Sequence, residues 1–114
     1  KVQYPTPHQE FDILEHEGID DKTITRLTQL SLELRASEAA GDLDTSPSPR
    51  TNQMFCDAYR VYDGSAKLKD RALPLALTHV ILNKFQSPKQ AETVAGRMQR
   101  VFGVNVNQRA MDDD

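Results

Sequence analysis

The chain has 114 residues, of which 38% are hydrophobic and 27% are charged, and its net charge is −3. This length supports one hydrophobic core, because two cores of half the size would each bury too little surface. The acidic balance offers no broad attraction to a phosphate backbone or an anionic membrane, so nucleic acid is a poor candidate partner. No apolar run reaches the roughly 18 residues needed to span a bilayer. We therefore expect one cytoplasmic domain with no membrane partner.

The single cysteine, Cys56, has no second cysteine with which to form an internal disulfide. It lies in an apolar periodic segment, which favours a buried thiol over a nucleophile and suits a reducing compartment. The chain opens on Lys1 in an extended-looking Lys-Val-Gln-Tyr-Pro, without an initiator Met or a signal-peptide pattern. We expect it to be a piece of a longer polypeptide.

The first helix is predicted from residue 7. Thr6 and Gln9 have the spacing of a capping box, and Pro7 suits the first helical position, where its missing N–H is not needed. Gly18 provides the left-handed conformation that ends a short helix. Its apolar side is expected to carry Phe11, Ile13 and Leu14.

Asp20 is the predicted cap of a second, longer helix that ends at Gly41. Apolar or small residues recur in it at spacings of three and four, which is typical of a helix with one buried side. These residues are Ile24, Leu27, Leu30, Ser31 and Leu34. The segment 42–47 is rich in Asp, Thr, Ser and Pro, which predicts a turn or an extended connection.

Ser48 and Pro49 repeat the pattern of cap plus proline and predict a third helix over Pro49–Asp63, ended by Gly64. Arg50 then lies in its first turn. The residues expected to face inward are Met54, Phe55, Ala58, Val61 and Tyr62. Tyr59 and Tyr62 are expected to pack in the core or at its rim rather than to stack on bases.

Asp70 is the predicted cap of a fourth helix, in which Pro74 is tolerated near the N-terminus. This segment is the most apolar and is expected to be central to the core. Its apolar residues are Leu73, Leu77, Val80, Ile81, Leu82 and Phe85. A fifth helix is predicted from Ser87-Pro88 to the stop at Gly103.

The fold class expected from these elements is all-α, a small helical bundle of about five helices. An extended segment covers residues 1–6, the bundle covers residues 7–103, and a polar, acidic tail covers residues 104–114. Within the tail, Val104–Asn107 alternates apolar and polar residues and could form a brief strand.

The sequence contains no phosphate-binding loop, no nucleophile elbow and no zinc-binding spacing of Cys and His. We expect no catalysis by this chain alone. His8, Asp12 and His16 recur at spacings of four and form the best metal candidate, but a solvated face with an acid between two exposed histidines is favoured. We expect no metal site.

Ser48-Pro49-Arg50 places a guanidinium at a helix N-terminus, where the helix dipole favours an anion. Such a placement is better understood if Arg50 reaches outward to a phosphate supplied by another group, because Arg offers planar, bidentate donors. The alternative is an ion pair between Arg50 and an acid such as Asp44 or Glu10.

Several segments resemble, in order, the C-terminal lid subdomain of MoxR-type AAA+ ATPases. They are Tyr4-Pro5, Gln9-Glu10-Phe11-Asp12-Ile13-Leu14, Ser48-Pro49-Arg50 and Ala72-Leu73-Pro74-Leu75-Ala76-Leu77-Thr78-His79. The resemblance implies that Arg50 is the second sensor, which reaches the γ-phosphate of ATP held with Mg²⁺ by a preceding α/β subdomain. It also implies contacts with neighbouring subunits of a ring and a role in remodelling a partner complex.

The chain departs from the family pattern at three points. Val80 follows His79 where the family usually carries Arg, Gly64-Ser65 replaces a Gly-Arg pair, and the helix from Pro88 extends past the usual lid. We expect His79 to be buried and hydrogen-bonded.

Two other functions remain open. In a stand-alone helical interaction or regulatory module, Arg50 would be dispensable. In a helix-turn-helix nucleic-acid binder, the recognition helix would be Pro49–Asp63 or Pro88–Phe102, the latter with Lys89, Arg97 and Arg100.

Overall fold

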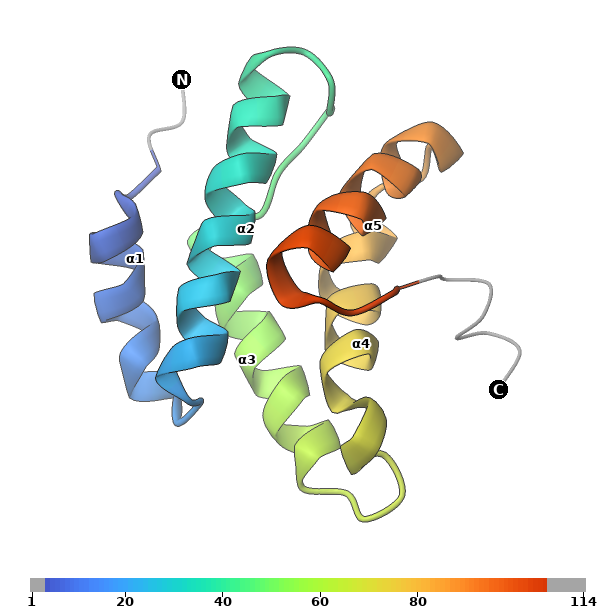
Figure 1. Cartoon of the computed structure of the whole chain (residues 1–114). Coiled ribbons are helices and arrows are strands. Elements are labelled where there is room, and N and C mark those ends of the chain that lie inside the picture. Colours follow the sequence, from blue (N-terminus) through green and yellow to red (C-terminus); the bar gives the residue numbers. More distant parts are fainter. Residues whose placement is uncertain (1–3, 107–114) are drawn as a thin grey trace.

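The computed structural model describes residues 4–106, and these residues form a helical bundle without strands (Figure 1). The predicted all-α class is therefore confirmed. The helices are α1 (Pro7–Leu14), α2 (Asp21–Ala39), α3 (Pro49–Asp63), α4 (Ala72–Ala76) and α5 (Pro88–Phe102). A one-turn 3₁₀ helix, Glu15–Glu17, extends α1. No helix in residues 4–106 is long and apolar enough to cross a bilayer.

The helices pack in neighbouring pairs along the chain and across it. α1 packs on α2, α4 lies against α3, and α5 returns across the bundle onto α2 (Figure 1). α3 also contacts α1, and the side of α3 that carries Met54 and Val61 is exposed.

Side-chain caps begin four of these helices at the predicted positions. Each cap oxygen accepts a hydrogen bond from a backbone N–H three residues later, which satisfies one of the unpaired donors of the first turn. The caps are Thr6, Asp20, Ser48 and Ser87. Gly18 (φ 78°) and Gly103 (φ 72°) take the left-handed conformation predicted for the ends of the first and fifth helices.

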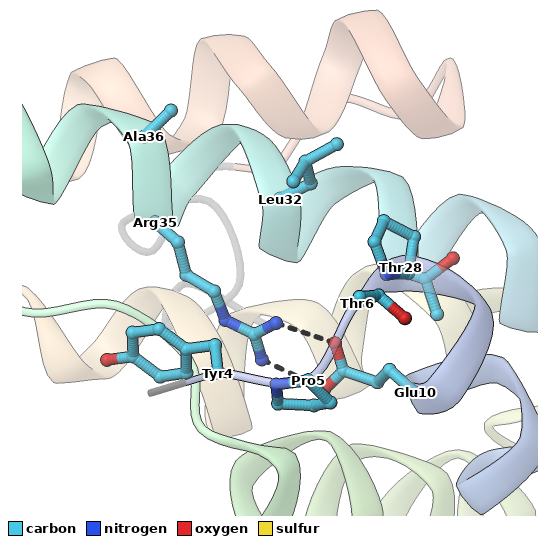
Figure 2. Close-up of a pocket in the computed structure, with 9 residues that line it drawn as sticks. Tyr4, Pro5, Thr6, Glu10, Thr28, Leu32, Arg35 and Ala36 are labelled. Atoms are coloured by element: carbon cyan, nitrogen blue, oxygen red, sulfur yellow. Dashed lines mark hydrogen bonds and ion pairs between the residues drawn. The ribbon is translucent and has the colours of Figure 1, made fainter. Parts of the chain in front are cut away.

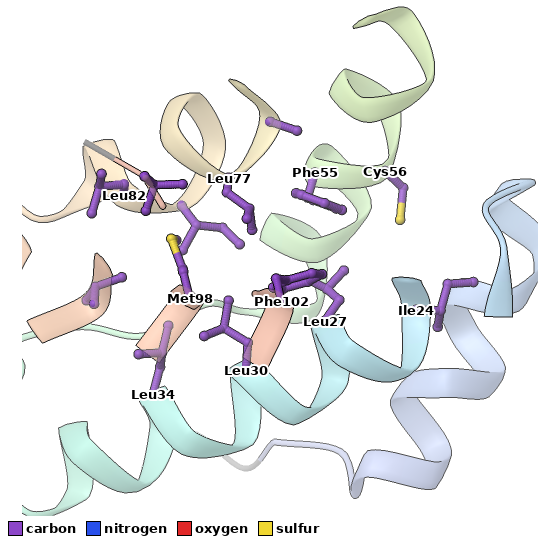
Figure 3. Close-up of a cluster of buried hydrophobic side chains, with 14 of the residues drawn as sticks. Ile24, Leu27, Leu30, Leu34, Phe55, Cys56, Leu77, Leu82, Met98 and Phe102 are labelled. Atoms are coloured by element: carbon purple, nitrogen blue, oxygen red, sulfur yellow. The ribbon is translucent and has the colours of Figure 1, made fainter. Parts of the chain in front are cut away.

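The core lies between α2, α3, the α4 segment and α5 (Figure 3). The α2 stripe is confirmed, since all five residues predicted for it are buried. Each fully buried large apolar side chain contributes about 1.5–3 kcal/mol relative to an exposed one. The core side chains that α2 faces include Phe55, Leu77, Met98 and Phe102.

The prediction of one fourth helix capped by Asp70 is wrong. Lys69–Arg71 forms a 3₁₀ turn, and α4 begins only at Ala72 without a side-chain cap. If Asp70 were the cap, Pro74 would be the fourth residue of the helix. The N–H at that position donates the first hydrogen bond of the helix, and proline has no N–H. Starting at Ala72 moves Pro74 into the first turn, where N–H groups have no intrahelical acceptor.

The rest of the predicted fourth helix changes its winding. A π-helix, η3 (Leu77–Ile81), follows α4 and passes into a 3₁₀ turn, Leu82–Lys84. Leu77, Ile81 and Leu82 are buried, so the segment still serves the core as expected. Leu73 and Val80 are only partly buried against that core.

Three residues predicted to face inward are exposed instead. The exposed fractions are 41% for Ile13, 51% for Met54 and 69% for Val61. The buried side of α3 contains Phe55 and Cys56. Successive residues of a helix point about 100° apart, so Met54 cannot share the direction taken by those two residues.

The brief strand predicted over Val104–Asn107 is absent where the structure describes it. Residues 104–106 follow α5 in irregular conformation, and Val106 is buried in the core. Asn107 and the remainder of the predicted acidic tail lie outside the described residues.

Candidate functional site

A buried ion pair joins the first two helices. Glu10 of α1 is fully buried, and its Oε1 and Oε2 atoms accept hydrogen bonds from Nη1 and Nη2 of Arg35 at 2.7 Å and 2.9 Å (Figure 2). Asn52 of α3 donates from Nδ2 to Oε2 of Glu10 and to Oγ of Ser31, both at 2.8 Å. These contacts link α1, α2 and α3 through one carboxylate, and nothing in the sequence analysis anticipated them.

The same arginine holds the segment that leads into α3. Nε of Arg35 donates to the carbonyl oxygen of Pro47 at 2.9 Å. Beside it, Oγ of Ser46 donates to Oε1 of Glu38 at 2.6 Å. Ser46 and Pro47 are both buried, so the connection that precedes α3 is fixed by side chains of α2.

Tyr4 covers this arrangement from the N-terminal segment. Its ring centroid lies 4.4 Å from the guanidinium carbon of Arg35, within the range of a cation–π contact. Its hydroxyl lies 3.2 Å from Oγ of Ser46 and 3.4 Å from Oε1 of Glu38. A pocket of about 340 Å³ opens beside the ring and is lined mainly by apolar groups, including Leu32 (Figure 2).

Arg50 occupies the second position of α3, as predicted, and its side chain is exposed. Ser48 caps the helix through the amide of Thr51 at 3.1 Å, and Pro49 occupies the first helical position. The first turn of α3 contains no acidic residue. Within residues 4–106 the guanidinium of Arg50 has no hydrogen-bond or ion-pair partner.

The alternative ion pairs for Arg50 are contradicted, because both acids are engaged elsewhere. Glu10 is paired with Arg35 inside the bundle. Asp44 accepts from Nε2 of Gln90 through Oδ2 at 3.1 Å, and the Asp44 amide donates to Oε1 of the same glutamine at 3.1 Å. Neither of these two acids is therefore the partner of Arg50.

The face of α3 that begins at Arg50 exposes two large apolar residues beside the acidic Asp57. Met54 and Val61 lie four and eleven residues further on, which places all three side chains within about 40° around the helix axis. The exposed residues adjoin a shallow groove of about 420 Å³ between α3 and η3. Its lining comprises Met54, Asp57, Ala58, Val61, Tyr62 and Val80.

His79 is exposed, which contradicts the prediction that it is buried. It is hydrogen-bonded as expected, with 2.8 Å between its Nδ1 and the hydroxyl of Tyr62. His79 lies in η3, where its neighbour Thr78 is buried. Tyr62 and Tyr59 are half-buried against the core, so the prediction of packing at its rim is confirmed.

The structure does not assemble the candidate metal ligands. Nε2 of His8 lies 3.6 Å from Oδ2 of Asp12, and both side chains are well exposed. His16 follows in the 3₁₀ turn after α1. Within the described part of the chain no three His, Cys, Asp or Glu residues are grouped as metal ligands would be.

Cys56 is fully buried in α3, as predicted. Burial raises the pKa of its thiol to about 11, and the charge of Glu17 adds to the rise while Arg60 opposes it. A thiolate is the nucleophilic form of cysteine. The thiol of Cys56 is therefore an unreactive core group at neutral pH.

Two of the basic residues proposed for nucleic-acid contact on α5 share one acidic partner. Arg97 and Arg100 both pair with Glu33 of α2, the former at 3.4 Å. Lys89 has no ion-pair partner among residues 4–106. This arrangement disfavours α5 as a recognition helix, since phosphate contacts need free cations.

No family model, curated protein or solved structure matches the chain. The likeness to MoxR lids therefore rests on the motifs in the sequence. Arg50, from the Ser-Pro-Arg segment of that likeness, lies in the first turn of α3.

Proposed function

We propose that this chain acts as the lid subdomain of a MoxR-type AAA+ ATPase and that Arg50 is its second sensor. In this proposal ATP and Mg²⁺ are held by an α/β subdomain that precedes the lid in the parent protein. The guanidinium of Arg50 contacts the γ-phosphate and stabilises the charge that develops as it is transferred. The observation that carries the proposal is the exposed Arg50 on an anchored helix start, where it has no partner among residues 4–106.

The electrostatics of α3 support a ligand outside the chain. A cation in the first turn is repelled by the positive end of the helix dipole, and α3 has no acid there to compensate. A phosphate above the helix start would reverse this cost, because it is attracted both by the guanidinium and by the dipole.

The exposed face of α3 supports a covering surface next to Arg50. Met54 and Val61 are exposed by more than half of their surface and line the groove between α3 and η3, so this face offers apolar contacts to a second surface. A second protein surface on this face, from the α/β subdomain or a neighbouring subunit, would bring a bound nucleotide close to Arg50. The remodelling partner complex would then respond to the nucleotide through movement of the lid.

The buried network supports movement of the lid as one body. Glu10, Arg35 and Asn52 join α1, α2 and α3 through short hydrogen bonds inside the bundle. Loss of the γ-phosphate would release Arg50 and change the orientation favoured by the whole bundle.

The test replaces Arg50 in the full-length polypeptide that contains this chain. We expect Arg50→Ala to lower kcat for ATP hydrolysis by about 10²-fold or more, as for other groups that stabilise transferring phosphate. Lys89→Ala is the matched control, because Ser87-Pro88-Lys89 places a cation at the same position of α5. Unchanged hydrolysis in Arg50→Ala, or a full-length polypeptide without a phosphate-binding loop, overturns the proposal.

The exposed groove beside Val61 favours one second candidate, a stand-alone helical interaction module. In that case Val61→Asp would abolish partner binding, whereas Arg50→Ala would leave it intact. The two substitutions therefore separate the candidates, because an ATPase lid depends on Arg50 itself.

A further inference from the structure

Tyr4 contacts the side chains that hold the start of α3. Two of them, Glu38 and Ser46, lie 34 and 42 residues from Tyr4 in sequence. Its ring lies over the guanidinium of Arg35, and its hydroxyl approaches Ser46 and Glu38. Ser46 directs its single hydroxyl proton to Glu38 at 2.6 Å, so the Tyr4 hydroxyl acts as the donor toward its two neighbours, Oγ of Ser46 at 3.2 Å and Oε1 of Glu38 at 3.4 Å.

Two side chains of α2, Arg35 and Glu38, hold the segment that leads to Arg50. Arg35 binds the carbonyl of Pro47, three residues before Arg50, and the Ser46 hydroxyl is held by Glu38. A change of the Arg35 rotamer would break its two hydrogen bonds to Glu10, because Nη1 and Nη2 each bind one carboxylate oxygen. A contact that stiffens Arg35 therefore stiffens the start of α3.

We infer that Tyr4 is a positioning residue for Arg50. It holds Arg35 and Ser46 in place, and these two residues fix the start of α3. The position of the N-terminal segment therefore affects the direction in which Arg50 points. The role of this coupling in an ATPase lid rests on the proposed function, whereas the contacts of Tyr4 lie within this chain.

The local chain makes Tyr4 suitable for transmitting a displacement. Pro5 and Pro7 flank Thr6, and each proline fixes one backbone dihedral, so the segment between Tyr4 and α1 is stiff. In the proposed lid this segment is the connection to the α/β subdomain. A movement of that subdomain would then pull Tyr4 away from Arg35 and Ser46 and loosen the helix start that carries Arg50.

Amide hydrogen exchange of the 114-residue chain tests the effect of Tyr4 on the start of α3. The reporter is the Thr51 amide, which bonds to the cap Ser48, and the internal control is the Gln90 amide, which bonds to Ser87 in the same way. We expect Tyr4→Leu to speed exchange at Thr51 about tenfold and at Gln90 much less, since a cation–π contact and a hydrogen bond are lost locally. Tyr4→Phe, which keeps the ring, should give a smaller increase.

The matched control is Tyr62→Phe, which removes a hydroxyl hydrogen bond to His79 from the body of α3 and should leave Thr51 unchanged. Equal acceleration at Thr51 and Gln90 in Tyr4→Leu would mean that Tyr4 only adds global stability, and it overturns the inference. An unchanged Thr51 rate overturns it as well.

In the full-length polypeptide, Tyr4→Leu should lower hydrolysis in wild-type background and have little further effect in an Arg50→Ala background. Equal losses in both backgrounds overturn the coupling between Tyr4 and Arg50. The proposed function is tested separately, by Arg50→Ala alone. A failure of the Tyr4 inference can therefore be distinguished from a failure of the proposed function.

Discussion

Arg35 binds both carboxylate oxygens of Glu10 while its third nitrogen binds the carbonyl of Pro47. The two residues lie 25 positions apart on different helices, and their side chains are 9% and 1% exposed. The pair is therefore desolvated, and each member is costly to leave alone in the interior. This relationship determines both the stability of the α1–α2 contact and the geometry of the segment before Arg50.

Removing the charge of Glu10 should destabilise the fold strongly. We expect Glu10→Gln to lower the free energy of unfolding by about 3 kcal/mol, because Arg35 is left buried without a counter-charge. That loss is a large share of the roughly 5–15 kcal/mol typical of a domain. Urea unfolding followed by circular dichroism measures it, with the exposed Glu15→Gln as control. A loss below about 1 kcal/mol would mean that water reaches the pair.

Reversing the charge of Arg50 should stabilise the isolated chain. Arg50→Glu places an acid in a first turn that has none, and we expect a gain of about 0.5 kcal/mol from the helix dipole. The gain should shrink at high salt, because the side chain is exposed. Thermal unfolding at low and high salt measures it, and Lys89→Glu on α5 is the comparison. If Arg50→Glu were destabilising, the arginine would have a structural role that the contacts within residues 4–106 do not reveal.

The helix boundaries could be predicted because they depend on residues within one turn. Ser48 and Asp20, for example, cap their own helices through amides three residues later. The fourth helix was the exception, since the effect of Pro74 depends on where the helix starts, and the apolar pattern does not fix that start. The winding of η3 also left no sequence signal. The exposure of His79 agrees with its position outside the predicted apolar residues of that segment.

The position of Arg50 could be predicted, but the network that holds it could not. Glu10 looked like a possible partner of Arg50, and Arg35 was not singled out at all. The one available signal was that Ser31 and Arg35 lie four apart in the same helix, which puts a charge beside a buried polar residue. The acid that pairs with Arg35 is set by the packing of α1, α2 and α3, which residue spacing within one helix does not determine.

The two valines Val61 and Val94 provide a matched test of the exposed α3 face. Val94 is fully buried in α5, whereas Val61 is 69% exposed. We expect Val94→Ala to cost about 1.5 kcal/mol or more and Val61→Ala to change stability by less than about 0.5 kcal/mol. Chemical denaturation of both variants of the chain measures the difference. Equal losses would place the Val61 side chain in a packed environment.

The contribution of Glu33 to stability should change with pH in the acid range. Burial raises its pKa, but hydrogen bonds from Gln29 and Arg100 and the charges of Arg100 and Arg97 outweigh burial and lower the pKa below the ordinary value of 4.5. The folded state thus favours the ionised form, so the stabilisation is present above pH 4.5 and is lost as the pH falls through the folded pKa.

Glu33→Gln should therefore lower the free energy of unfolding at neutral pH, and its difference from the wild type should narrow below pH 4.5. Urea unfolding at about pH 7 and about pH 3 measures this narrowing. Glu92→Gln, on the exposed side of α5, is the control and should show no such trend. A difference that stays constant across this range would contradict the assignment of the lowered pKa to Glu33.

Cys56 should be protected from thiol reagents until the fold opens. Its side chain is fully buried, and burial raises the pKa of the thiol to about 11 from an ordinary value of 9.0, so little thiolate exists and reagents cannot reach it. Because the folded pKa is raised, the thiol's contribution to stability is complete below pH 9.0 and is lost as the pH rises through about 11.

The chain has one cysteine, so the stoichiometry of labelling by a disulfide reagent is unambiguous. We expect the native chain to react more slowly than the urea-unfolded chain by about 10³-fold or more, because labelling waits for opening. A Cys56→Ala variant with cysteine introduced at the exposed Ala66 is the control and should react at once. Glu10→Gln should accelerate the labelling of Cys56 by about tenfold for each 1.4 kcal/mol of stability that it loses, since opening of the bundle is then more frequent. Rapid labelling of the native wild type would contradict the burial of Cys56 between α3 and its neighbours.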